Sequence, residues 1–355
     1  MRTIYKTGLT GLILLFCFVL LSCEKTAEEE EERLSFDVLV LNEGLWNMNN
    51  AGITGYNSTS GKRVDDVYSQ ANNGRKLGDL ANDVHLYGSK VYIAVTTSNQ
   101  MDVLDAETGV SLRQIPFSPS GIAQPRRITS YKGKIYVCCL DGSIVKIDTT
   151  SLQIETAVKA GRNPDGICVA NNKLYISNSG GLDFPNYDNT VSVFDLNTFT
   201  EIKKIPVKIN PTLIKADENE NVYVVSMGNY EDISPCMQRI NSVTDQVERI
   251  FEIEIANFDI YKNFLYFYTY NYSTQQASYQ ILDLLEDSVT NTNFITEAHL
   301  PQTPYGINID ARNGDVYITD AMDYTSTGDV YCFSKEGRKK FQFEAGVIPK
   351  KVIVK

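Results

Sequence analysis

Histidine and tryptophan are scarce in this chain, whose 355 residues include two histidines and one tryptophan. A metal centre built from several histidines, or a catalytic triad with a histidine base, is therefore hard to assemble from His85 and His299. No serine lies in a nucleophile-elbow motif. The sequence predicts a binding protein, not an enzyme, with no metal site and no cofactor.

Basic residues are outnumbered by acidic ones, 33 against 44, which gives a formal net charge of -11. No basic stripe occurs along the chain, so nucleic acid is not expected as a partner. Apolar residues at helical spacing are nearly absent. Short runs of Val, Ile, Tyr, Phe and Thr instead alternate with turn residues every 8 to 12 positions or so, which indicates an all-β protein.

The cysteines show no metal-ligand spacing. Five remain beyond the N-terminal segment that holds Cys17 and Cys23, and most of the five lie in apolar runs, where a free cysteine packs as a small hydrophobic residue. A bridge from Cys138 or Cys139 to Cys168 stays open, because sequence does not supply the geometry.

One short pattern repeats along the chain: a proline or its substitute, followed three residues later by a β-branched residue. The spacing of about 39 to 47 residues is that of a propeller blade. The copies begin at Ala81, Pro125, Pro164, Pro211, Asn257, Pro304 and Pro349.

The residues after the first six of these anchors predict a hairpin, since a turn rich in Gly, Asn, Asp and Lys precedes an apolar-Tyr-apolar strand such as 91–93 or 135–137. Residues 37–41 have the same strand character but no anchor before them. We therefore expect the last strand, 351–354, to complete this first blade and close the ring. The predicted fold is an all-β, seven-bladed β-propeller over residues 37–355.

The fourth repeat, with 164–169, 174–178 and 190–198, resembles the YVTN-type repeat of YncE-like seven-bladed propellers. The resemblance covers essentially all of residues 37–355. It implies the fold and says little about function, because this scaffold hosts many unrelated sites.

The N-terminus has the features of an export signal: Arg2 and Lys6 precede an apolar stretch, 8–21, that is too short to span a bilayer stably. The sequence Leu-Leu-Ser-Cys that ends at Cys23 resembles the lipobox of bacterial lipoproteins. This resemblance implies that residues 1–22 are a signal peptide and that Cys23 is acylated. The alternative is an ordinary secretory signal with a chance cysteine.

Residues 23–36 contain five consecutive glutamates, 28–32, and are expected to form a solvated tether between lipid and ring. The run also resembles the acidic export signal that sends lipoproteins of some Gram-negative gut anaerobes to the outer face of the outer membrane. A plain tether is the alternative.

Candidate binding residues lie in loops, because the loop before each innermost strand and the loop between the second and third strands share one face of a propeller. Two of the latter loops, at 97–100 and 140–143, are short; the other five carry aromatic residues, among them the only tryptophan. Aromatic rings beside Asn and Asp suit a large, flat, partly polar ligand. Alternatively, they pack the loops against neighbouring blades. The candidate ligand-binding residues are Trp46, Asn47, Asn49, Asp183, Phe184, Tyr187, Tyr230, Tyr272, Tyr305 and Tyr324.

Lipobox, acidic tether, propeller and aromatic loops together resemble the BtuG-type surface lipoproteins. That resemblance implies capture of cobalamin (vitamin B12) or a related corrinoid on the loop face. It further implies transfer to a TonB-dependent outer-membrane transporter, and a place at the cell surface held by the lipid anchor alone. Two alternatives remain: a surface binder of a glycan, peptide or protein, and a propeller enzyme of the lactonase or quinoprotein type.

Overall fold

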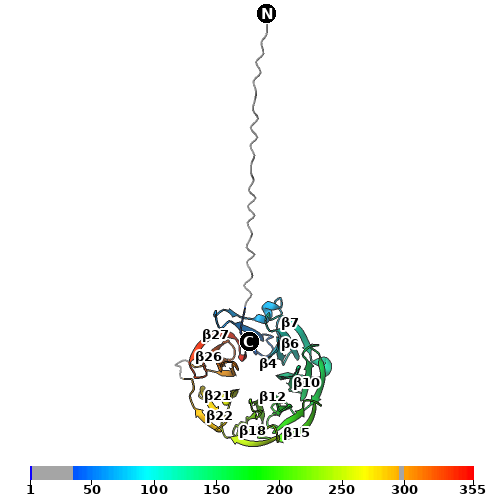
Figure 1. Cartoon of the computed structure of the whole chain (residues 1–355), viewed down its shortest axis with the longest axis vertical. Helices are drawn as coiled ribbons and strands as arrows, with labels where there is room; N and C mark the ends of the chain where they lie inside the picture. Colours follow the sequence, from blue (N-terminus) through cyan, green and yellow to red (C-terminus); the bar gives the residue numbers. More distant parts are fainter. Residues whose placement is uncertain (2–34, 296–299) are drawn as a thin grey trace. The chain divides into compact units, whose positions relative to one another are not determined.

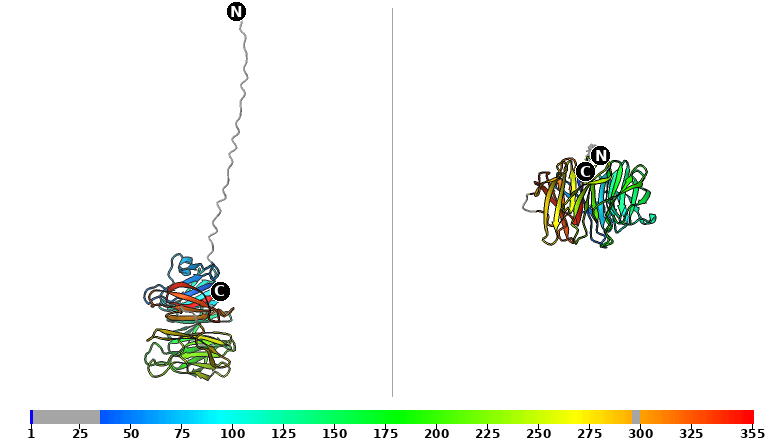
Figure 2. Two further views of the ribbon diagram at one scale, coloured as in Figure 1. Left: turned by 90° about the vertical axis from the view of Figure 1, so that its left-hand side faces the viewer. Right: turned by 90° about the horizontal axis from the view of Figure 1, so that it is seen from below.

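The polypeptide forms seven four-stranded antiparallel sheets in the computed structural model, which describes Met1, residues 35–295 and residues 300–355. Figure 1 shows these sheets as blades arranged around a common centre, and Figure 2 shows the strands running across the thickness of the ring. The predicted all-β, seven-bladed propeller is confirmed. The expected signal peptide 1–22 apart from Met1, the lipidation site Cys23, most of the tether 23–36 and His299 lie outside the described residues.

Each blade is numbered in chain order, and its strands are given from the innermost to the outermost. Blade 1 contains β28 (Pro349–Val354), β1 (Val38–Asn42), β2 (Gly52–Tyr56) and β3 (Arg63–Val64). Blade 2 contains β4 (Ala81–Tyr87), β5 (Lys90–Val95), β6 (Gln100–Asp105) and β7 (Ser111–Pro116). Blade 3 contains β8 (Pro125–Tyr131), β9 (Lys134–Cys139), β10 (Ser143–Asp148) and β11 (Ile154–Lys159). Blade 4 contains β12 (Pro164–Ala170), β13 (Lys173–Asn178), β14 (Thr190–Asp195) and β15 (Thr200–Pro206).

Blade 5 contains β16 (Pro211–Ala216), β17 (Val222–Ser226), β18 (Cys236–Asn241) and β19 (Gln246–Phe251). Blade 6 contains β20 (Asn257–Tyr261), β21 (Phe264–Asn271), β22 (Gln276–Asp283) and β23 (Ser288–Asn291). Blade 7 contains β24 (Pro304–Ile309), β25 (Val316–Asp320), β26 (Thr327–Phe333) and β27 (Lys339–Val347). Among the described residues, the helices are the short α1 (Val67–Ala71) and the 3-10 turn η1 (Ser118–Ser120).

Every repeat anchor is the first residue of an innermost strand, as the sequence predicted. The β-branched residue three positions later packs into the core; Ile128, for example, is 5% exposed. In every blade except blade 6 the register between the innermost strand and its neighbour shifts directly beside the anchor. Such a β-bulge changes the direction in which the next side chain points. The residue after the anchor therefore points toward the centre of the ring, as at Arg126 and Asp165, which line the central cavity.

The ring closes as predicted, because β28 pairs antiparallel with β1, with Val352 opposite Val40 and Val354 opposite Val38. The backbone N–H of Lys355 extends the ladder by donating to the carbonyl of Asp37 at 2.8 Å. This pairing covers the inner edge of β1, which an open ring would leave exposed to other chains.

Five described cysteines are buried and free, so the bridge from Cys138 or Cys139 to Cys168 does not form. Tyr136, on the second strand of blade 3, is 2% exposed and belongs to the core. Within the described ranges, no helix is long and apolar enough to cross a membrane.

Candidate functional site

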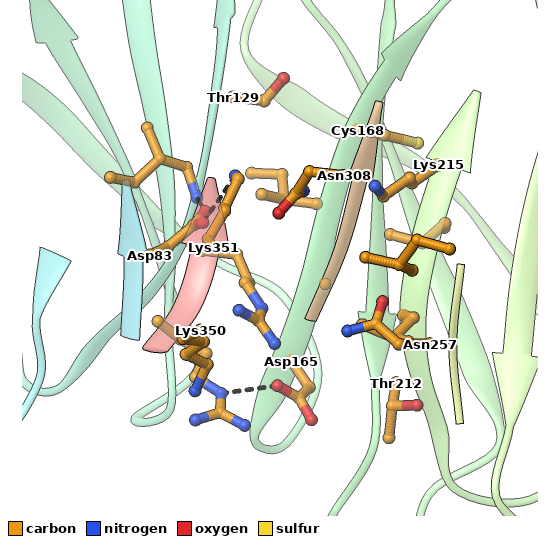
Figure 3. A pocket seen from close by; sticks show the side chains of 18 of the residues that line it. Asp83, Thr129, Asp165, Cys168, Thr212, Lys215, Asn257, Asn308, Lys350 and Lys351 are labelled. Atoms are coloured by element: carbon orange, nitrogen blue, oxygen red, sulfur yellow. Dashed lines mark hydrogen bonds and ion pairs between the residues drawn. The ribbon is translucent and has the colours of Figure 1, made fainter. Parts of the chain in front are cut away.

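A cavity of about 640 Å³ occupies the centre of the ring, lined by residues from the innermost strands of all seven blades. Figure 3 shows its walls, with Asp165, Lys350, Thr212 and Asn257 toward one end and Thr129 and Cys168 toward the other. Its volume lies within the range of about 300–1,000 Å³ of small-molecule sites. The cavity is therefore large enough for a polar arm of a ligand.

A network of charged and polar side chains surrounds one end of this cavity; we call it the mouth network. The Nζ of Lys350 donates to Glu43 Oε1 at 3.0 Å and to Asn82 Oδ1 at 2.8 Å, while the hydroxyl of Tyr305 donates to Glu43 Oε2 at 2.7 Å. Arg126 donates from Nε to Asp165 Oδ1 at 2.6 Å. Arg126 also donates to the side-chain oxygen of Asn82. The network consists of Glu43, Asn82, Arg126, Asp165, Tyr305 and Lys350.

The pKa values in the mouth network follow from burial and crowding of charge. Burial lowers the pKa of Lys350 to about 8, and repulsion by Arg126 adds to this effect, while Glu43 opposes it. Burial would raise the pKa of Asp165, but Arg126 and other cations outweigh burial and hold it at about 2. For Glu43, Lys350 and Tyr305 likewise overcome burial and lower its pKa. At neutral pH both carboxyl groups are therefore charged, and Lys350 remains mostly protonated.

Farther along the cavity, charged side chains again form pairs. Lys351 pairs with Asp83 (Figure 3), with Nζ 2.7 Å from Oδ1, and Lys215 Nζ lies 2.7 Å from Asp259 Oδ1. The other oxygen of Asp83 accepts the backbone N–H of Ile128 at 2.8 Å. These carboxylates connect neighbouring innermost strands as well as balancing the lysines.

Aromatic residues from loops of adjacent blades gather beside the mouth of the cavity. Tyr230 lines the cavity itself. The ring of Tyr187 contacts that of Tyr230 with centroids 6.1 Å apart, and the ring of Phe184 contacts that of Tyr187 with centroids 5.9 Å apart. Tyr230 and Phe184 remain 66% and 64% exposed. The Phe184 loop is held by Arg162, which bonds Asp183 at 2.6 Å and Asp188 at 3.0 Å.

A second aromatic group comes from blades 6 and 7. Tyr305 lines the cavity and contacts Tyr324 with ring centroids 5.9 Å apart. Tyr272 is 77% exposed and contacts Tyr270 at 4.9 Å. Tyr270 lies in β21 and is buried. We refer to the exposed or half-buried rings of both groups as the aromatic rim: Phe184, Tyr187, Tyr230, Tyr272, Tyr305 and Tyr324.

Trp46 lies apart from the aromatic rim. It is 69% exposed, and among the described residues no ring contact joins it to another aromatic side chain. Asn47 and Asn49 have φ of 62° and 51°, a left-handed conformation that asparagine tolerates better than most residues. The N–H of Asn47 is further fixed by Asp79 at 2.9 Å. The two asparagines thus have a clear conformational role in the turn, and Trp46 itself does not line the cavity, although Glu43 at the start of the same loop belongs to the mouth network.

Of the mouth network, only Tyr305 was among the residues predicted from the sequence, although a signal for the others was present. The position directly after the anchor is polar in all repeats except blade 6, where it is the buried Phe258. These polar positions are Asn82, Arg126, Asp165, Thr212, Tyr305 and Lys350. A polar residue repeated at this register of the innermost strands marks the side that faces the ring centre.

Comparison with known proteins supports the scaffold. A family model described as a domain of unknown function (DUF5074) matches residues 37–114, which contain β1 to β6 and most of β7. No curated protein matches the chain significantly.

Many solved structures share the fold. A quinoprotein alcohol dehydrogenase-like protein from Bacteroides thetaiotaomicron aligns with a TM-score of 0.64 and 18% identity, covering 90% of this chain and 78% of that one. Hydrazine synthase of Kuenenia stuttgartiensis aligns with a TM-score of 0.58 and 16% identity, covering 70% of this chain and 74% of the hydrazine synthase chain. The WD40 domain of Neurospora crassa Pan2 aligns with a TM-score of 0.57 and 10% identity, covering 77% of this chain and 81% of that domain's chain. At such identities the likeness establishes a propeller similar to quinoprotein alcohol dehydrogenase-like propellers and no shared activity.

Proposed function

We propose that this protein is a surface lipoprotein that captures cobalamin or a related corrinoid and passes it to a TonB-dependent outer-membrane transporter. The observation that carries the proposal is the aromatic rim, which extends over blades 4 to 7 beside the mouth of the polar central cavity. Binding, not catalysis, is the proposed activity, and within the described residues no cluster of metal-ligating side chains occurs.

The chemistry of a corrinoid fits this arrangement in two respects. Its broad, flat ring system offers apolar area to Tyr230 and Tyr272, whose rings are largely exposed and lose little entropy on binding. Its amide arms are hydrogen-bond donors and acceptors that match the amides, carboxylates and cations of the mouth network. A ligand with a flat body and polar arms thus uses both parts of the site.

The proposed location rests on the sequence alone. The basic start, the short apolar stretch and the lipobox ending at Cys23 support lipid anchoring, and the glutamate run 28–32 supports export to the outer face of the outer membrane. A lipid-anchored binder at this surface would meet its ligand before the transporter does.

Isothermal titration of the soluble ring, residues 35–355, with cyanocobalamin tests the proposal directly. We expect saturable binding, and a red protein fraction after desalting. Tyr230→Ala should weaken binding by about 2 kcal/mol, the scale of an aromatic hot spot. Tyr87→Ala is a control on an innermost strand outside the rim. Absence of heat and colour with cyanocobalamin and with other corrinoids would refute corrinoid capture.

A further inference from the structure

The charges around the central cavity pair almost completely. Five cationic side chains line it, and four of them have a carboxylate partner within 3.0 Å. The pairs are Arg126 with Asp165, Lys350 with Glu43, Lys351 with Asp83, and Lys215 with Asp259.

Arg127 is the remaining cation. Its Nη1 donates to the backbone carbonyl of Asn82 at 2.9 Å, and within the described part of the chain no carboxylate forms an ion pair with it. A guanidinium carries five N–H donors, so most of its donor capacity is left for a ligand. The nearby His85 adds no charge at neutral pH, because burial and then Lys351 lower its pKa to about 4. The cavity therefore holds one positive charge in excess, inside a protein whose formal net charge is -11.

Further donors line the same cavity. The side-chain oxygen of Asn308 accepts the N–H of Val352 at 2.8 Å, which leaves its amide NH₂ as a donor. The hydroxyl of Thr129 also lines the cavity, and Figure 3 shows Thr129, Asn308 and Lys351 on its walls. Arginine, amide and hydroxyl groups are the usual protein partners of phosphate oxygens.

We propose that the central cavity binds an oxyanion of single negative charge, of the phosphodiester class, with Arg127 as its main partner. One negative charge neutralises the one unpaired cation, whereas a dianion would leave an uncompensated charge away from bulk water, which is costly. The inference deepens the proposed function and depends on it for the ligand's identity, since the nucleotide arm of cobalamin carries one phosphodiester.

The anion site can be tested without a corrinoid. Dimethyl phosphate, a monoanionic phosphodiester, is titrated against the ring by ligand-observed ³¹P NMR, with neutral trimethyl phosphate as the matched probe. We expect saturable binding of dimethyl phosphate alone, weakened about tenfold or more in Arg127→Met, because a charge-assisted hydrogen bond is lost. The control Arg113→Met removes an exposed arginine of the outer strand β7 and should change nothing.

Arg127→Lys guards against misfolding, because it keeps the charge and should retain part of the affinity that Arg127→Met loses. The unfolding midpoint of each variant is measured alongside. Equal binding of the charged and neutral probes, or equal binding of dimethyl phosphate by the wild type and a folded Arg127→Met variant, would overturn the inference.

A second pair of titrations identifies the source of the anion. If the phosphodiester belongs to the captured ligand, Arg127→Met weakens cyanocobalamin but leaves cobinamide, which lacks the nucleotide arm, unchanged. If both corrinoids are unaffected while dimethyl phosphate binding is lost, the site takes a free anion. Failure of the wild type to bind any corrinoid would refute the proposed function, yet the dimethyl phosphate result would stand by itself.

Discussion

Replacing Glu43 by glutamine removes the carboxylate that supports Lys350 in the mouth network. Glu43 is 8% exposed and lies 3.0 Å from Lys350 Nζ, so solvent screens the pair little. Glutamine has nearly the same shape and still accepts hydrogen bonds, which confines the change mainly to charge. Without the carboxylate, Lys350 faces Arg126 and Arg127 with no adjacent counterion, and its pKa should fall below its present value of about 8.

The size of the effect follows from this fall. An opposite charge at such a distance shifts a pKa by about 1 to 3 units, and one unit corresponds to about 1.4 kcal/mol, so the loss in the free energy of unfolding is about 1.4 to 4 kcal/mol. The loss depends on pH with a definite sign. Where the unfolded chain binds the proton of Lys350 and the folded variant does not, stability rises with pH. The deficit relative to the wild type is therefore largest at low pH and shrinks as the pH rises toward and above about 8, where Lys350 becomes neutral in both proteins.

Urea unfolding followed by far-UV circular dichroism at several pH values between about 6 and 9.5 measures this difference; urea carries no salt that would screen the pair. Glu344→Gln is the matched control, because that carboxylate lies 3.1 Å from Arg63 but is half exposed, so it should cost under about 1 kcal/mol at every pH. Adding Lys350→Met to Glu43→Gln should restore stability at low pH. A deficit of the same size at all these pH values would refute the reasoning.

Other perturbations test the closure of the ring, the attachment to the membrane and the aromatic rim. Deleting residues 345–355 removes β28 and should lower the melting temperature far more than an ordinary tail truncation does; an unchanged melting temperature would contradict closure by this strand. Cys23→Ser should release the protein from the membrane fraction in cell fractionation, and retention there would contradict acylation. Trp46→Ala should weaken cyanocobalamin binding less than Tyr230→Ala does, since only Tyr230 of the two lines the cavity. Neither substitution should shift the melting temperature much, whereas Tyr136→Ala, in the core, should lower the melting temperature by several degrees. A larger effect of Trp46→Ala on binding would move the site toward the β1–β2 loop.

The sequence predicted the blades because their information is local and repeated. In blades 2 to 7 each anchor, such as Pro125, is followed within a few residues by the strand, turn and tyrosine strand of its own hairpin, and the structure reproduces this order. The closure of the ring was also predictable, because the predicted strand 37–41 lacked a neighbouring strand on its inner side and the predicted strand 351–354 lacked one on its outer side.

The mouth network could not be predicted in the same way, because its partners are distant in sequence. Lys350 and Glu43 are separated by 307 positions, and Arg126 and Asp165 by 39. The bulges turn the residue after each anchor inward, and the repeated polar position signals which residues face the centre but not which of them form pairs. Of the loop candidates, Tyr230 lines the cavity and Trp46 does not; Trp46 was favoured for its rarity, which says nothing about position.

Ring closure also determines when a binding site can exist during the life of the polypeptide. Lys350 and Lys351 belong to the last strand, while Glu43 follows the first one, so the cavity wall is incomplete until the final residues have been synthesised and have paired. A pairing of such sequence separation is expected to form late in folding. Fragments shortened at the carboxyl end by premature termination or by proteases would therefore retain most blades yet lack a finished cavity. Ligand binding would report on the completeness of the molecule as well as on its fold.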